Sequence, residues 1–228
     1  MAVINDPTVA ANIARAGAVS YLPFHTLGGP FPVGNGGAYR IDMQSANLTA
    51  SLVTGSEIFQ FRYATSNGRV ALIFGVSFSM ANIVAATGAA ACGVELVAAR
   101  SYTANGSGGT GATLTGNNAK LRSSHATTEV ADIRCASTVA LTNGTRTLDT
   151  QGLGSVSFSF VTGAITVALD GNICPKTNLL GEFTGGLAWP LILAGNEGFI
   201  IRTIGQNFPA GATPRFSVDV AWMEADAF

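Results

Sequence analysis

Residues 58–78 read IFQFRYATSNGRVALIFGVSF, and this stretch decides the fold class of the chain. Aromatic and polar side chains alternate over residues 59–63, which predicts a half-buried β-strand. The apolar run 70–78 predicts a second strand, central in its sheet and buried on both faces. Asn67-Gly68 stands between the two runs and is a strong β-hairpin signal. We therefore expect an antiparallel hairpin here.

The same kind of pattern recurs on both sides of this stretch. Further strands are predicted at 39–43, 94–102, 156–160, 165–169, 189–193, 199–204 and 216–222. In the last of these, Asp219 faces out while Phe216, Val218, Val220 and Trp222 face in. Many short strands, Gly-rich turns and almost no helical periodicity predict a single β-sandwich or barrel domain.

The N-terminal 36 residues differ from the rest and are expected to form an arm before a domain over 37–228. Asp6-Pro7 and Gly17 predict the start and the end of one short helix. Residues 20–37 contain three prolines and five glycines, which predicts an irregular, extended chain. Apolar arm residues could pack on their own domain or on a neighbouring subunit, and for the second alternative the contact candidates are Tyr21, Phe24 and Phe31.

Charge is scarce in this sequence. Charged residues make up 11% of the chain and the formal net charge is −1, against a usual charged share of about 25%. Either Ser, Thr, Asn and Gly cover the surface, or much of the surface faces other subunits. No basic cluster predicts nucleic-acid binding. The uncharged run 71–94 is interrupted by polar and small residues, so we expect two buried strands joined by a loop rather than a membrane helix.

Groups able to do chemistry are few and dispersed. Cys92, Cys135 and Cys174 have no metal-ligand spacing and are expected to be buried free thiols. His25 and His125 are the two histidines. Ser124-His125 is nominally a nucleophile and base, but no GxSxG elbow accompanies it. We therefore predict no catalytic residue, no cofactor site and no metal site.

Residues 99–124, ARSYTANGSGGTGATLTGNNAKLRSS, form a tract of small polar residues. Gly111 and Gly116 have the outer spacing of a phosphate loop, but Asn117-Asn118 replaces the required Lys and Ser/Thr. A strand-like run precedes the tract and Leu121-Arg122 follows its glycines. We expect an ordered loop of the fold at one end of the sandwich, placed against a neighbour; the role of its part 103–119 stays open.

Five segments together resemble a group of tailed-bacteriophage virion structural proteins. They are SEIFQFR (56–62), LVAARSY (96–102), GSGGT with ATLTGNNAKLR (106–110 and 112–122), PLILAGNEGF (190–199) and VDVAWME (218–224). The group resembles the capsid cement, or decoration, proteins. That resemblance implies a jelly-roll-like antiparallel β-sandwich without catalytic residues or cofactors.

The resemblance also implies a place and partners. The expected protein is made in the host cytoplasm and sits as a homotrimer on the capsid exterior, bound to the major capsid protein and to neither nucleic acid nor membrane. A second interpretation stays open, a tail or baseplate protein with a glycan-binding face, because an exposed Trp189 could contact a sugar ring. Trp222 is instead expected in the core. A third class, an enzyme acting on the host envelope, lacks any paired catalytic set in this sequence.

Overall fold

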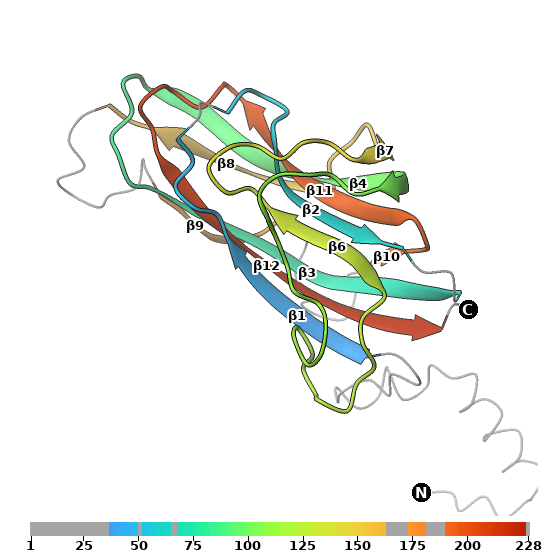
Figure 1. Cartoon of the computed structure of the whole chain (residues 1–228). Coiled ribbons are helices and arrows are strands. Elements are labelled where there is room, and N and C mark those ends of the chain that lie inside the picture. Colours follow the sequence, from blue (N-terminus) through green and yellow to red (C-terminus); the bar gives the residue numbers. More distant parts are fainter. Residues whose placement is uncertain (1–36, 50–51, 65–67, 163–172, 181–189, 227–228) are drawn as a thin grey trace, which may run out of the picture. The chain divides into compact units, whose positions relative to one another are not determined.

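The computed structural model describes residues 37–49, 52–64, 68–162, 173–180 and 190–226. Over these residues the secondary structure is entirely β, in two antiparallel sheets packed face to face (Figure 1). The predicted β-sandwich is confirmed. The arm with its predicted helix, the three contact candidates in it and the predicted strand at 165–169 lie outside the described residues.

Sheet A contains five strands, with β12 and β3 in its middle. They are, in spatial order, β1 (Gly37–Gln44), β12 (Pro214–Asp226), β3 (Arg69–Asn82) and, on the far side of β3, β9 (Ile173–Asn178) and β10 (Leu191–Leu193). β9 pairs with the second half of β3 and β10 with its first half.

Sheet B contains seven strands, with β2, β11 and β4 in its middle. They are, in spatial order, β5 (Thr110–Gly111), β6 (Val130–Cys135), β2 (Glu57–Tyr63), β11 (Glu197–Gly205), β4 (Ala90–Ala104) and, on the far side of β4, β7 (Thr145–Leu148) and β8 (Gly154–Phe160).

Eight of the strands form four nested pairs, in which a strand early in the chain pairs with one late in the chain. β1 pairs with β12, β2 with β11, β3 with β9 and β4 with β8, and every pair is antiparallel. β1, β2, β3 and β4 alternate between sheets A and B. This nesting in two sheets is the arrangement of a jelly roll. The structure therefore has the jelly-roll-like sandwich that the resemblance implied.

Aromatic rings join the two sheets in the core. Phe61 of sheet B stacks on Phe199 at 4.9 Å between ring centroids and meets Trp222 of sheet A edge-on at 5.4 Å. Trp222 in turn stacks on Tyr39 at 5.3 Å. Each fully buried side chain of this size stabilises the fold by about 2–3 kcal/mol, so this cluster is a main source of the attraction between the sheets.

The three cysteines are free and buried, as predicted. Burial raises the pKa of Cys92 to about 11 and that of Cys135 to about 12. Burial also raises the pKa of Cys174. Thiols with such high pKa values carry little thiolate at neutral pH and are poor nucleophiles.

The hairpin predicted at Asn67-Gly68 is wrong. β2 and β3 belong to different sheets, so the chain passes from one sheet to the other between them. Alternation shows which face of a strand is buried but not which strand lies beside it. β3 is central, as predicted, but its outer face stays partly open at Leu72 and Phe74.

Candidate assembly surface

The Gly/Ser/Thr/Asn tract packs closely against the outer face of sheet B, and we call it the cover. Its β5 pairs with β6, and Gly109 has a left-handed φ of +58°. A Cβ at Gly109 would collide with the carbonyl oxygen of Cys135, and one at Gly106 with the side chain of Gln60. The tract is an ordered loop, as predicted, but it lies over the face of sheet B and not at one end of the sandwich, where its glycines allow the backbone to approach the sheet closely.

A buried polar cluster lies beneath this cover. Glu57 and Arg146 form an ion pair in which each side chain is 3% exposed. Gln60 donates to Glu57 Oε2 at 2.8 Å and accepts from the Tyr102 hydroxyl at 3.0 Å. Burial lowers the pKa of Arg146 to about 10. This cluster holds β7 to β2 and has almost no access to solvent, so it is part of the scaffold.

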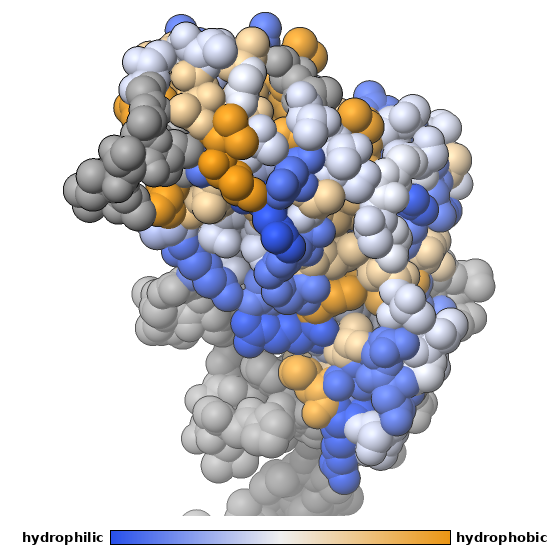
Figure 2. All heavy atoms as spheres, turned by 60° about the vertical axis from the view of Figure 1, so that its left-hand side comes forward, coloured by the Kyte–Doolittle hydropathy of each residue, from blue (hydrophilic) through white to orange (hydrophobic). Residues whose placement is uncertain are grey.

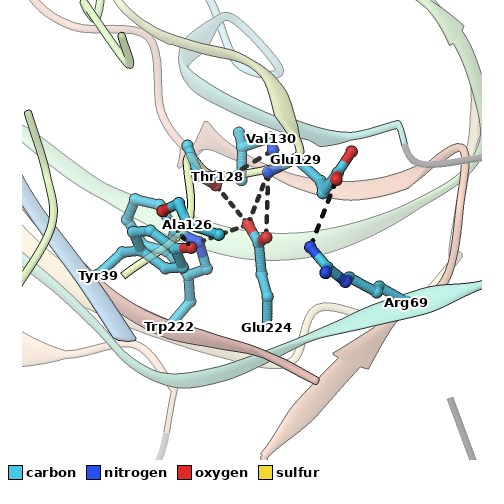
Figure 3. A network of polar contacts seen from close by, with 8 residues as sticks. All are labelled: Tyr39, Arg69, Ala126, Thr128, Glu129, Val130, Trp222 and Glu224. Atoms are coloured by element: carbon cyan, nitrogen blue, oxygen red, sulfur yellow. Dashed lines mark hydrogen bonds and ion pairs between the residues drawn. The ribbon is translucent and has the colours of Figure 1, made fainter. Parts of the chain in front are cut away.

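Loop 126–130 is tied to the sandwich by a second buried carboxylate, Glu224 of β12 (Figure 3). Its carboxylate accepts from the Thr128 hydroxyl, from the Glu129 amide at 3.0 Å and from the Trp222 indole N–H at 3.3 Å. Burial raises the pKa of Glu224, although all three donors favour its ionised form. The glutamate therefore anchors the loop that follows the tract.

Two further contacts complete this region of the fold. The Arg69 guanidinium lies 3.5 Å from the Glu129 carboxylate, and the Tyr39 hydroxyl donates to the Ala126 carbonyl at 3.0 Å (Figure 3). His125 Nδ1 accepts from the Ala38 amide at 3.1 Å. This histidine therefore holds the loop to β1. We call loop 120–130, with the start of β3 and the end of β12, the charged end.

The outer face of sheet A carries a charged strip. Arg40 and Lys176 both bind the Asp219 carboxylate, with 2.8 Å between Lys176 Nζ and Oδ2. Burial alone would raise the pKa of Asp219, but the hydrogen bonds from Arg40 and Lys176 outweigh burial and hold this pKa below its ordinary value. A hollow of about 340 Å³ adjoins the strip and is lined by these residues, by Asp42 and Phe78, and by three serines.

At the opposite end of the sandwich the described loop residues include no charged side chain, whereas residues 163–172 between β8 and β9, which contain Asp170, lie outside the described residues. We call the loops 45–56, 83–89, 136–144 and 206–213, together with residues 161–162, the uncharged end. Most of these loops join strands at the left of Figure 1, where β1, β3, β8 and β11 end, whereas loop 136–144 leads from the end of β6 to β7 on the right. No Asp, Glu, Lys, Arg or His occurs in any of them.

Loop 206–213 ties the other loops of the uncharged end together. The Phe208 amide donates to the Leu52 carbonyl at 2.8 Å and the Thr87 amide to the Ala210 carbonyl at 3.0 Å. Asn82 accepts from the Thr213 amide at 2.9 Å and donates to the Val84 carbonyl at 2.7 Å. Neutral hydrogen bonds thus hold the loops in place.

Large hydrophobic side chains stand exposed on this end. Five of the nine that are exposed among the described residues lie in these loops, Val53, Ile83, Val84, Val139 and Val161, and Ile173 stands beside them at the start of β9. Ile173 pairs with Ala81 near the end of β3, and the carbonyl next to Val139 accepts from the Thr49 amide. In Figure 2 several orange side chains stand above a band of blue, hydrophilic residues. The described loops of this end therefore combine apolar exposure with an absence of charge.

The other sequence-predicted groups are placed as follows. Trp222 is 1% exposed and lies in the core, as predicted, whereas Trp189 and His25 lie outside the described residues, like the arm candidates Tyr21, Phe24 and Phe31. In the part of the chain that the structure describes, no group of three His, Cys, Asp or Glu side chains is placed to hold a metal ion. Over the same residues, no helix has the length and apolarity to cross a membrane.

Sequence reasoning missed the buried roles of Glu57, Arg146 and Glu224. Glu57 and Glu224 have the parity of the inward-facing residues of their strands, but nothing in the local sequence marks the partners that make burial of a charged side chain possible. The sequence alone revealed only one part of the uncharged end, namely that the run 71–94 contains no charged residue. No protein-family model matches this chain, and a search of curated proteins found no match.

Proposed function

We propose that this protein is a non-enzymatic structural component of a phage virion, a capsid cement protein that stabilises the shell by bridging subunits of the major capsid protein. It acts as a homotrimer on the capsid exterior, and neither nucleic acid nor a membrane takes part. Linked contacts from several copies give an avidity far above that of any single contact.

The observation that carries the proposal is the uncharged end. Its described loops have no charged residue and expose aliphatic side chains, and depletion of charge distinguishes the core of protein–protein interfaces from the rest of a protein surface. Exposed apolar groups gathered at one place mark interaction sites. A protein whose task is to be held between other subunits needs such a surface.

Two further observations support the proposal. The jelly roll is an architecture of viral capsid domains, although lectin domains share it and fold alone does not define function. The segments that resemble phage virion proteins include most of β2, about half of β4 and of β12, all of β10 and the start of β11. They therefore belong to the scaffold itself.

The test is the copy number of this chain in purified virions, measured by quantitative mass spectrometry with the major capsid protein and a tail protein as internal standards. We expect a number of the same order as that of the shell subunits. Particles that lack the chain should also release their DNA at a lower temperature. A chain absent from virions, or present without any effect on the shell, would overturn the proposal.

A tail or baseplate protein with a glycan-binding face is the second candidate. The hollow on sheet A favours it, because Arg40, Lys176 and the nearby serines could hydrogen-bond sugar hydroxyls. A copy number near that of the tail standard, together with binding to host surface glycans that Lys176→Ala abolishes, would establish this candidate instead.

A further inference from the structure

We propose that a row of apolar residues on the outer face of sheet A is the docking site of the chain's own N-terminal arm, with residues 26–36 as the occupant. The row crosses four strands at one register position, with Ala38 on β1, Met223 on β12, Leu72 on β3 and Ile192 on β10. We call it the apolar row. The inference concerns the arm alone, so it stands or fails independently of the proposed place in a virion.

The apolar row faces away from the core. Trp222 and Ile73, which precede Met223 and follow Leu72 in the chain, belong to the core between the sheets. Successive side chains of a strand point to opposite faces, so Met223 and Leu72 lie on the outer face. Ile192 stands between two leucines that pack on the core and is 40% exposed. The row is therefore a strip of apolar side chains on the side of sheet A that does not contact sheet B.

Exposure differs sharply along this outer face. The Met223 side chain, in the middle of the apolar row, is 5% exposed. The side chains of Arg40 and Lys176 in the charged strip of the same face are 56% and 58% exposed. A segment that lies over the row and leaves the charged strip open explains this difference.

The arm is the segment of the chain that ends at the apolar row. The described part begins at Gly37, directly before Ala38 of the row. The row spans three strand spacings, about 14 Å, and an extended chain covers about 3.3 Å per residue. Phe31 stands six residues before Gly37. Its side chain can therefore reach every position of the row.

The composition of the arm suits an apolar surface. Residues 26–36 include Phe31 and Val33 and contain no Asp, Glu, Lys, Arg or His. Such a segment can lie on apolar side chains without removing water from an ion. The rival occupant is the connection 181–189, which also lies outside the described residues and precedes β10. It contains Glu182, whose carboxylate would lose water on this surface.

Prolines decide how the arm can bind. Pro30 and Pro32 have no backbone N–H, so this part of the arm is poorly suited to pairing with an edge strand. The edge of β1 beside the row is also occupied, because the Leu121 amide donates to the Ala38 carbonyl at 3.0 Å. Both observations favour packing over the face of the sheet, where side chains and not backbone groups make the contact.

The experiment measures how fast hydrogen peroxide converts each methionine of the full chain to its sulfoxide, by peptide mass spectrometry. Met43 and Met80 belong to the core, are 8% and 3% exposed, and serve as internal standards. We expect Met223 to react as slowly as these two in the wild type and at least tenfold faster in Phe31→Asp combined with Val33→Asp. Unchanged rates at Met43 and Met80 show that the variant is folded.

Leu187→Asp is the matched control, because it places the same charge in the connection 181–189. It should leave Met223 at the wild-type rate. Three outcomes would overturn the inference. They are a Met223 that stays slow in the arm variant, a Met223 that Leu187→Asp accelerates instead, and a wild-type protection that disappears on dilution. The second would assign the apolar row to the connection 181–189, and the third to the arm of a second copy.

Discussion

At the uncharged end, neutral hydrogen bonds connect the loops to one another, whereas at the charged end three hydrogen-bond donors converge on a buried carboxylate. Asn82 joins two loops through one amide side chain. Glu224 joins loop 126–130 to β12 through three donors. Both ends close the same two sheets, but the described loops of one do so without any charge.

The two ends differ in the free-energy cost of distorting them and in the cost of removing water from them. A buried carboxylate needs every one of its donors, so the charged end cannot change shape without a large cost. The described loops of the uncharged end have no ion to strip of water, so covering them costs little desolvation energy. The charged end is therefore suited to closing the fold and the uncharged end to assembly.

The largest expected effect lies at the charged end. Glu224→Ala leaves the Thr128 hydroxyl, the Glu129 amide and the Trp222 indole without their acceptor, which should lower the free energy of unfolding by about 3 kcal/mol or more. Chemical denaturation measures this loss. Glu129→Ala is the control, because it removes only a half-buried ion pair, worth about 1 kcal/mol or less. Equal losses would contradict the central role of Glu224.

The next effect tests the cover that adjoins the uncharged end. Gly109 and Gly116 both have a left-handed φ, of +58° and +67°, but only Gly109 lacks room for a Cβ. Gly109→Ala should cost about 2–3 kcal/mol, because it adds a steric collision to the strained backbone conformation. Gly116→Ala should cost about 1 kcal/mol from the conformation alone. If thermal melts give the two variants the same loss, the tract is not a fitted cover.

A smaller effect is expected at the uncharged end itself. Asn82→Ala removes the side chain that holds the Val84 carbonyl and the Thr213 amide, at a cost of about 1–2 kcal/mol. It should also lower the copy number of the chain in virions, since Val84 is no longer held in place. Asn118→Ala, at an exposed amide in the tract, should change neither quantity. Loss of stability without any change in copy number would show that Asn82 does not support the binding surface.

The smallest effect is a pH dependence that only the charged end should show. Burial raises the pKa of Glu224, so between its ordinary pKa and the raised value the folded chain holds a proton that the unfolded chain has released. The contribution to stability is complete below the ordinary pKa and is lost as the pH rises through the raised pKa. The stability difference between the wild type and Glu224→Gln should therefore shrink from acid to neutral pH. Denaturation curves across this range measure it, and a constant difference would contradict the raised pKa.

Side-chain alternation was enough to predict most of the long strands and the sandwich. It placed Phe61, Trp222 and Asp219 on the correct faces, because alternation reports burial directly. It could not predict the neighbours of each strand, which is why the Asn67-Gly68 hairpin was wrong. The strands at Val130–Cys135 and Ile173–Asn178 were missed, since their short runs mix polar with apolar residues.

The candidate surface was harder to predict than the fold. The uncharged end is assembled from loops more than 100 residues apart in the sequence, and only the nested strand order brings them together. Gln60 is fully buried although its strand has alternating faces, because a cover from residues 105–144 lies over it. Such covering depends on tertiary structure and leaves no trace in the local pattern.

The nested pairing also sets the order in which the chain can fold during synthesis. β12 lies between β1 and β3, and Tyr39 is opposite Trp222, so sheet A cannot close until residues 214–226 have left the ribosome. Contacts this far apart in sequence make folding slow, on the order of milliseconds to seconds. Loop 206–213, which ties the uncharged end together, is made equally late. Translation thus delays completion of the uncharged end until β12 has been made, so an unfinished chain has neither sheet A nor this end in its final form.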